Sequence, residues 1–202
     1  TISQNIATTS TSTSAIILNA GKTASAGTAA GGNLIITGSP SLSTGSGGRA
    51  NLFTGSISGS TGLTALVGSG SGNFRYNSDE LSTNFTTSLG TGIYAIYREQ
   101  PTISIAADPL LLPYSISPSP TTTKAGMQNG DLISQAISST ITTTVGGSLS
   151  SSGYYVIGDH SLTPSGAVGG LGYAFSYSSS TLTVSAKTFT ITGAFYAAIL
   201  IG

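Results

Sequence analysis

Residues 31–56 read GGNLIITGSPSLSTGSGGRANLFTGS, and this stretch contains one short apolar word twice, as NLIITGS and then as ANLFTGS. Each word carries β-branched or aromatic residues and leads into a glycine, which is typical of a short strand that runs into a turn. Glycines also recur at one constant spacing, at Gly21, Gly38, Gly55 and Gly72. A short, even repeat of this kind predicts that each period is one coil of a β-solenoid, whose parallel strands stack on those of the next coil.

The repeat also predicts which side chains form the core. We expect Ile17, Ile35 and Leu52 to point inward and stack in columns, with glycines at the corners, where a positive φ is needed. The alternative is a low-complexity linker rich in serine and glycine. A linker does not require apolar residues that recur in phase, as residues 34–36 and 52–53 do. The pattern therefore favours the solenoid.

Composition excludes several classes of partner. Among the 202 residues, 6 are Lys or Arg and 6 are Asp or Glu, so the formal net charge is zero. We therefore expect no nucleic-acid partner and no attraction to an anionic membrane surface. The longest uninterrupted apolar run, residues 194–201, is far shorter than the roughly 20 residues of a membrane-spanning helix, so we expect no membrane insertion. The start, TISQNIATTS, has no basic or cleavable apolar region, and we expect a mature product or an excised segment.

Chain organisation predicts an all-β protein in three parts. No window shows apolar residues at helical spacing. Residues 1–105 are predicted to be solenoid rungs and a cap, in which Arg98 and Glu99 form a solvated surface pair. Residues 106–123 hold four of the seven prolines, which predicts a stiff connector or an edge strand. Residues 124–202 are predicted to form a second β module with a C-terminal apolar strand.

A hairpin is predicted near the end of the second module. Tyr173, Phe175 and Tyr177 alternate along one face, and SSS follows them. Leu182, Val184 and Ala186 then return on a matching face, so we expect the two segments to pair with each other.

Two blocks of sequence resemble a known family. The first block resembles the end of the β-helix of filamentous-haemagglutinin-like adhesins, bacterial exoproteins exported by two-partner secretion. The second resembles the MBG or YDG-type modules that follow such helices. The blocks are GNLIITGSPSLSTGSGGRANLFTGSISGSTGLTALVGSGSGNFRYNSDE with YAIYREQPTISI, and GMQNGDLISQAI with GYYVIGDHSLTPSGAVGGLGYAFSY and TLTVSAK.

The resemblance implies a fold and a role. It implies the end of a right-handed parallel β-solenoid followed by a small β-grasp or immunoglobulin-like module. It further implies a secreted or cell-surface structural protein of an adhesin or filament, acting in adhesion or biofilm matrix. It transfers no catalytic residue and no cofactor, so we expect no enzymatic activity.

Residue chemistry supports the same expectation. The single histidine, His160, follows Asp159, but no GxSxG occurs, so we expect a turn histidine. The chain cannot supply the three or four nitrogen or sulfur ligands of a zinc site, because it has no cysteine and only one histidine. Asn77, Asp79 and Glu80 form a fragment of a calcium loop at most. An isopeptide bond from Lys124 or Lys187 to Asn129, with Asp131 as the proton shuttle, is a further hypothesis.

The chain ends carry a hypothesis of self-association. TISQNIATTSTSTS has little to bury, so we expect its backbone to pair with something. TFTITGAFYAAILIG is uncharged, and its exposed edge favours aggregation. Either neighbouring copies satisfy both ends in a head-to-tail homopolymer, or the chain satisfies them internally. The candidate self-association residues are Phe189, Ile191, Phe195, Tyr196, Ile199, Leu200 and Ile201.

Two other functions remain open. A glycan-binding adhesin module would use exposed tyrosines as a platform for surface glycans or exopolysaccharide, and the candidates are Tyr154, Tyr155, Tyr173 and Tyr177. The same alternation also fits a core face with hydroxyls at its edge. A β-solenoid polysaccharide lyase is disfavoured, because neither Arg49 nor Arg75 has clustered acids beside it.

Overall fold

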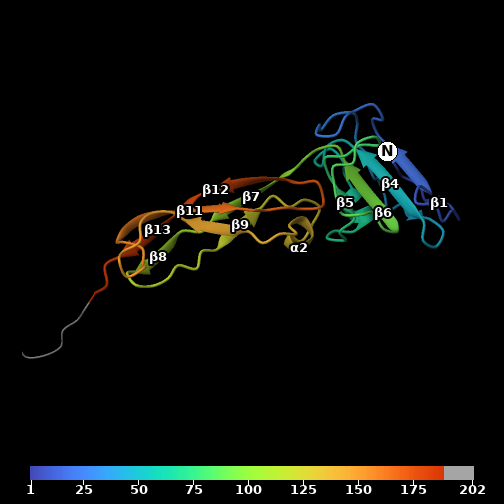
Figure 1. The fold of residues 1–202 in the computed structure, drawn as a ribbon. Coiled ribbons are helices and arrows are strands. Elements are labelled where there is room, and N and C mark those ends of the chain that lie inside the picture. Colours follow the sequence, from blue (N-terminus) through green and yellow to red (C-terminus); the bar gives the residue numbers. More distant parts are fainter. Residues whose placement is uncertain (189–202) are drawn as a thin grey trace, which may run out of the picture.

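The molecule is elongated and almost entirely β-structured (Figure 1). The computed structural model describes residues 1–188. Two helices occur in this part of the chain, α1 (Leu63–Val67) and α2 (Ile133–Ala136), and neither is long or apolar enough to traverse a bilayer. The predicted all-β class is confirmed.

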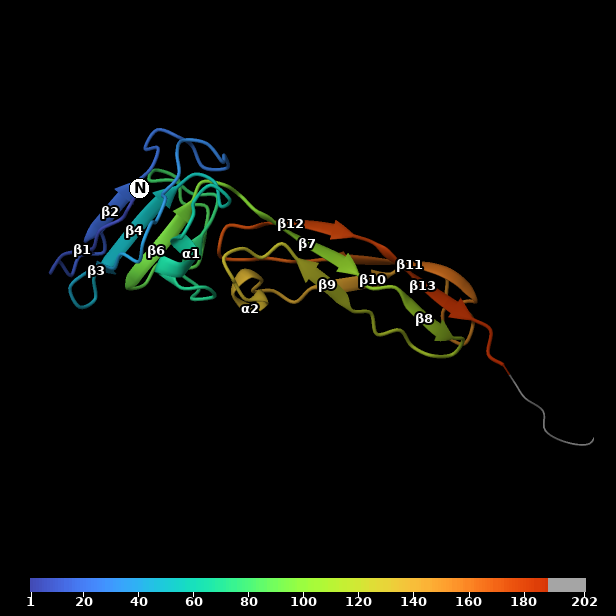
Figure 2. The same ribbon diagram turned by 180° about the vertical axis from the view of Figure 1, so that it is seen from behind.

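A parallel sheet forms the N-terminal part. Its strand order is β2-β4-β6-β5, and every neighbouring pair is parallel. A second, two-stranded parallel sheet joins β1 to β3. Figure 2 shows the stacked strands from behind. The strands are β1 (Ile6–Ala7), β2 (Ile16–Asn19), β3 (Leu42–Ser43), β4 (Arg49–Thr54), β5 (Phe74–Arg75) and β6 (Gly92–Tyr97).

Two of the parallel pairings have an offset that is twice the glycine spacing. Ile16 pairs with Ala50, and Ile2 pairs with Ile36, so both pairs have the same separation along the chain. The pairings of Ile6 with Leu42 and of Arg49 with Gly92 have longer offsets, so the spacing of paired strands is not constant.

The predicted glycine corners are confirmed in part. Gly21, Gly38 and Gly72 have φ values of 99°, 71° and 76°, whereas Gly55 has no positive φ. A Cβ at Gly21 would clash with the Gly31 carbonyl oxygen.

The predicted core columns are wrong in part. Leu52 is fully buried, but Ile17 is 55% exposed and pairs with Asn51. Side chains alternate along a strand, so Ile16 and Leu18 face inward and Ile17 faces outward. The inward column is Leu18, Leu52 and Ala95.

The N-terminal segment finds its partners within the same chain. Ile2 donates its backbone N–H to the Ile35 carbonyl at 2.7 Å, and Ile6 donates to the Ser41 carbonyl at 2.9 Å. Of the two hypotheses for this end of the chain, the internal one is confirmed.

Two mixed sheets form the C-terminal part. Their strand orders are β12-β7-β9 and β10-β11-β13-β8. The strands are β7 (Thr102–Ala107), β8 (Leu110–Pro113), β9 (Thr122–Ala125), β10 (Thr142–Val145), β11 (Gly158–Ser165), β12 (Ala174–Ser178) and β13 (Ser180–Ser185).

The predicted hairpin between β12 and β13 is wrong. β12 pairs in parallel with β7, and β13 pairs in parallel with β8. Thr102 aligns with Ala174 and Leu110 with Leu182, so both pairs share one offset along the chain. The serines between β12 and β13 therefore carry the chain onward from one sheet to the next. Local alternation predicted the faces of both strands but not their partners.

The division between the two parts falls earlier than the sequence predicts. β7 begins at Thr102, and its Ile103 and Ile105 are fully buried. Part of the proline-rich stretch also belongs to the C-terminal part, since residues 110–113 form β8. β8 is the edge strand of its sheet. An edge position suits proline, which cannot donate to a neighbouring strand. The edge-strand alternative therefore holds for residues 110–113.

Two apolar cores run through the molecule. The larger one crosses the division, since Leu52 and Phe74 belong to the same cluster as Ile105, Ala136 and Leu171. The smaller one lies at the far end of the C-terminal part, where Leu162, Leu182 and Val184 pack together. We call that far end the distal tip.

Candidate functional site

The junction between the two parts holds a buried polar cluster, and an open cleft lies on the same junction. The cluster consists of Tyr76, Asn129, Asp131 and Tyr173, and Tyr76 follows β5 in the N-terminal part. The other three come from the C-terminal part, where Asn129 and Asp131 lie between β9 and α2 and Tyr173 precedes β12.

Hydrogen bonds tie the junction cluster together across the division. The hydroxyls of Tyr76 and Tyr173 both donate to Asp131 Oδ2, at 2.8 and 2.9 Å. Asn129 Nδ2 donates to the Tyr76 hydroxyl at 3.1 Å, and Thr64 Oγ1 donates to Asn129 Oδ1 at 2.7 Å. The rings of Tyr76 and Tyr173 have centroids 4.6 Å apart. The cluster thus joins segments that are distant from one another in sequence.

Burial controls the protonation of the junction cluster. Desolvation raises the pKa of the Asp131 carboxyl, and the two tyrosine donors oppose that rise. Burial also raises the pKa of the Tyr76 and Tyr173 hydroxyls, so both remain donors at neutral pH. Asp131 Oδ1 is buried without a hydrogen-bond partner. The Asp131 carboxyl therefore keeps its proton to a higher pH than a free aspartic acid does, since a neutral carboxyl costs less to bury.

The two arginines of the predicted cap, Arg75 and Arg98, are buried. The burial of Arg98 corrects the expectation that it forms a solvated surface pair with Glu99. Arg98 is fully buried and donates to the carbonyls of Ala20, Ala30 and Gly32. Arg75 is also buried and donates to carbonyls of nearby loops, including Thr87 at 3.1 Å. These guanidiniums supply donors that loops without sheet partners require. Their N–H donors therefore stabilise the loops.

The open cleft beside the cluster has a volume of about 430 Å³. It is lined by Ile57, Ser58, Glu99, Gln100, Pro101, Thr102 and Gln128. Most of these side chains are polar, and one of them, Glu99, carries charge. Clefts of this size at the boundary between two structural units are common places for ligands.

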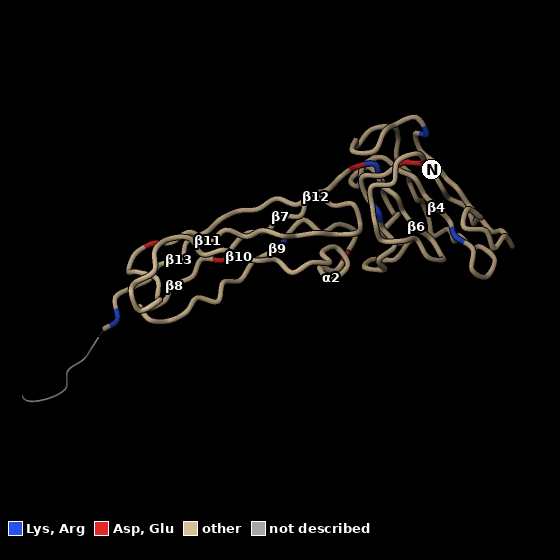
Figure 3. Tube along the Cα trace, in the orientation of Figure 1, with Lys and Arg blue, Asp and Glu red and all other residues tan. Residues whose placement is uncertain are grey.

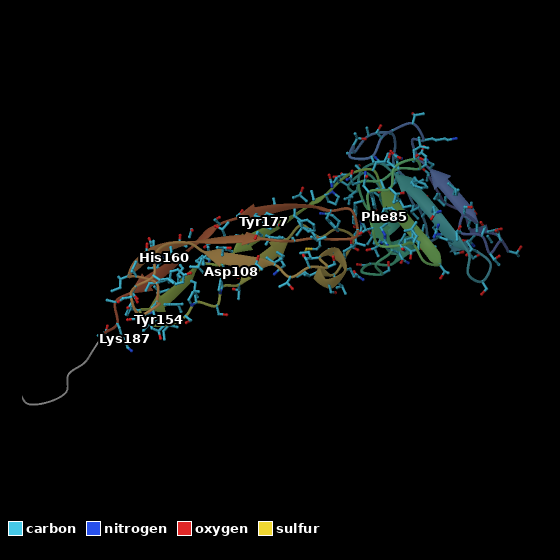
Figure 4. All side chains as sticks on the ribbon, in the orientation of Figure 1. Phe85, Asp108, Tyr154, His160, Tyr177 and Lys187 are labelled. Carbon is cyan, nitrogen blue, oxygen red and sulfur yellow. The ribbon has the colours of Figure 1, made fainter. Side chains whose placement is uncertain are left out.

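The four candidate tyrosines do not form one platform. Tyr173 is buried in the junction cluster, whereas Tyr177 is 41% exposed in the middle of the C-terminal part. Tyr154 lies at the distal tip, far from Tyr177 (Figure 4). There Tyr154 packs edge-on against Tyr114, with centroids 6.0 Å apart, and Tyr155 packs against His160. The hypothesis of a shared tyrosine surface is therefore wrong.

His160 is a buried residue of β11 at the distal tip. Its Nε2 lies 2.7 Å from the Val156 carbonyl oxygen, and its Nδ1 is buried without a partner. The neighbouring Asp159 instead accepts a hydrogen bond from Thr183 Oγ1 at 2.7 Å. Successive residues of a strand face opposite ways, so the two side chains do not act together.

The structure places Asp79 of the calcium-loop fragment and Lys124 of the isopeptide hypothesis in other contacts. Asp79 accepts hydrogen bonds from the backbone N–H groups of Ala26, Leu81 and Ser82. Among residues 1–188, no group of three or more His, Cys, Asp or Glu side chains is placed to hold a metal ion. Lys124 Nζ donates to Thr122 Oγ1 at 2.8 Å and not to the junction cluster.

The candidate self-association residues, Phe189, Ile191, Phe195, Tyr196, Ile199, Leu200 and Ile201, lie outside the described residues. Sequence reasoning named Asn129 and Asp131 only as part of the isopeptide hypothesis. It missed their contact with Tyr76, because nothing local in GMQNGDLIS indicates a partner so far away in sequence.

Comparisons with protein-family models, with curated proteins and with solved structures find no match to this chain.

Proposed function

We propose that the chain is a structural unit of an extracellular bacterial adhesin or filament, secreted or held at the cell surface. Residues 1–101 are the end of a right-handed parallel β-solenoid, and the C-terminal part is a module of the β-grasp or immunoglobulin-like kind. The proposal assigns the chain a mechanical role and no catalytic one.

One observation carries the proposal, namely the stacking of parallel strands with an open edge. β2 pairs with β4 on one side and has no other strand partner among residues 1–188. Its outward Ile17 is exposed. An unpaired parallel edge of this kind accepts a further strand through backbone hydrogen bonds. We propose that a neighbouring copy supplies this strand, which gives a head-to-tail polymer.

Sparse charge supports close packing of copies. Lys, Arg, Asp and Glu are few and scattered along the molecule (Figure 3). Several of them are also internal, as Arg75 and Arg98 are. The electrostatic repulsion between neighbouring copies is therefore small.

Blocking the β2 edge tests the proposal. Ile17→Lys places a charge on the exposed edge and is expected to raise the concentration needed for assembly by about tenfold. Leu81→Lys, at a loop position that is 92% exposed, adds the same charge and leaves assembly unchanged. Sedimentation velocity and negative-stain electron microscopy measure the effect. A wild-type protein that sediments as a monomer at micromolar concentration contradicts the polymer.

A further inference from the structure

We propose that the junction cleft is a binding site for a neutral saccharide. The cleft, lined by residues 57–58, 99–102 and 128, collects side chains from both parts of the molecule. The inference gives the proposed adhesin a ligand and rests on that adhesive role. It does not depend on self-assembly.

The cleft presents several hydrogen-bond acceptors. Glu99 Oε2 accepts from the Ile57 N–H at 2.6 Å, which fixes the carboxylate and leaves Oε1 for a ligand. Gln100 Nε2 donates to the Gly172 carbonyl at 3.4 Å, and Gln128 Nε2 donates to the Gly126 carbonyl at 2.9 Å. Each amide thus uses one of its two N–H donors on the protein, which orients the group and leaves both amide oxygens as acceptors for a ligand.

Hydroxyl groups match this set of acceptors. A sugar ring presents several O–H donors, which one carboxylate and two amide oxygens can receive. The Ser58 and Thr102 hydroxyls donate or accept as the ligand requires. Ile57 and Pro101 provide an apolar surface against which the C–H face of a sugar can pack.

Charge selects among the saccharides. Among residues 1–188, Glu99 is the one charged side chain that lines the cleft, so this lining carries negative charge. A uronate, a sulfated sugar or a phosphate would bring like charge beside Glu99 and lose binding free energy. The cleft therefore favours neutral sugars over acidic ones.

The cleft lies where a bound ligand would contact both parts of the molecule. Gln128 also donates its backbone N–H to the Tyr173 hydroxyl at 2.8 Å, and Tyr173 belongs to the junction cluster. A saccharide that contacts both Ser58 and Gln128 therefore bridges the N-terminal and C-terminal parts. We expect a bound ligand to restrict motion at the junction.

Calorimetric titration of the full chain tests the site. The probes are neutral oligomers of glucose, galactose, mannose and N-acetylglucosamine, with an oligouronate for comparison. At least one neutral oligomer is expected to bind, and the oligouronate is expected to bind at least tenfold more weakly. Failure of all neutral oligomers at millimolar concentration overturns the proposal, as does equal binding of the oligouronate.

Two variants locate the binding. Gln128→Ala removes one acceptor and is expected to weaken binding by roughly tenfold. Ser58→Trp fills the cleft from an exposed position and is expected to abolish binding. Gln4→Ala, in the exposed N-terminal segment, is the matched control and is expected to bind like the wild type. Unchanged binding in both cleft variants overturns the proposal.

Self-assembly is measured on the same proteins. Ser58→Trp is expected to form the same polymers as the wild type, because Ser58 is remote from the β2 edge strand in sequence and is not part of that sheet. Loss of sugar binding with intact assembly is the expected result for this variant. If the wild type neither binds sugar nor forms polymers, both the cleft and the proposed function fail, and each failure has its own readout.

Discussion

At the scale of single residues, buried polar groups decide how the loops and the junction are held. Arg98 binds carbonyls of three different residues, and Asp131 receives two tyrosine hydroxyls. Such groups stabilise a protein when their partners are in place and cost free energy when one partner is removed.

Removing the Arg98 guanidinium leaves loop carbonyls without donors. Arg98→Met is expected to lower the free energy of unfolding by about 3 kcal/mol. Lys22→Met removes the same charge from an exposed loop and is expected to change it by less than about 0.5 kcal/mol. Urea denaturation followed by circular dichroism measures both. Equal effects would mean that the carbonyl contacts of Arg98 contribute nothing.

The Asp131 carboxyl predicts a dependence of stability on pH. Burial raises its pKa in the folded state above the unfolded value of 3.8, so the folded state binds the proton more tightly. The contribution of Asp131 is therefore fully present below the unfolded pKa and is lost as pH rises through the folded pKa. Asp131→Asn mimics the protonated carboxyl and should remove this loss.

The measurement compares the two proteins at several pH values. Urea unfolding at pH 4, 5, 6 and 7 gives the difference in unfolding free energy between the wild type and Asp131→Asn. The wild type is expected to lose stability relative to the variant as the pH rises. A difference that stays constant, or that changes in the opposite direction, would contradict a raised pKa. Taking the difference cancels other carboxyls, such as Asp79, whose pKa lies below its usual range.

At the scale of elements, the arrangement of the C-terminal part depends more on which strands pair than on the β propensity of each strand. β7 and β8 run beside β12 and β13 with one common offset, although the chain between them forms β9, β10, β11 and α2. Parallel strands need such a long connection. The serines after β12 are typical of a hairpin turn, but β13 pairs with β8 and β11 instead of with β12.

Two leucines in the paired strands β13 and β8 differ in burial, so their substitutions test how much burial contributes to stability. Leu182 of β13 is fully buried, whereas Leu111 of β8 is 69% exposed. Leu182→Ala is expected to cost about 2–5 kcal/mol of unfolding free energy, because a cavity forms in the distal core. Leu111→Ala is expected to cost less than about 0.5 kcal/mol. Chemical denaturation distinguishes the two, and similar costs would show that β8 and β13 are not arranged as described.

At the scale of the whole molecule, the two parts share a core and a polar cluster. The larger apolar cluster contains buried residues from β4 and β6 as well as β7. The elongated shape therefore does not divide into two independent units at the junction. The hydrogen bonds of Tyr76 and Tyr173 to Asp131 join the two parts in addition to the backbone near Pro101.

Hydrogen exchange tests this coupling between the parts. Tyr76→Phe removes a donor to Asp131 and is expected to reduce the protection of β4 and β7 amides together, by about 1–3 kcal/mol. Tyr155→Phe removes a hydrogen bond to the Val145 carbonyl at the distal tip and is expected to leave β4 unchanged. Loss of protection in β4 alone after Tyr76→Phe would show that the parts unfold separately.

Local pattern in the sequence was sufficient for the all-β class, for most of the predicted glycine corners and for an edge position of proline. Those features depend on φ, on side-chain alternation and on backbone donors, which are properties of a few adjacent residues. Tertiary structure alone decided the offsets between the paired parallel strands, the partners of β12 and β13, the burial of Arg98 and the meeting of Tyr76 with Asp131. These features join residues that are distant in sequence, and the choice among many possible partners depends on which arrangement buries the most apolar surface and satisfies the most buried polar groups.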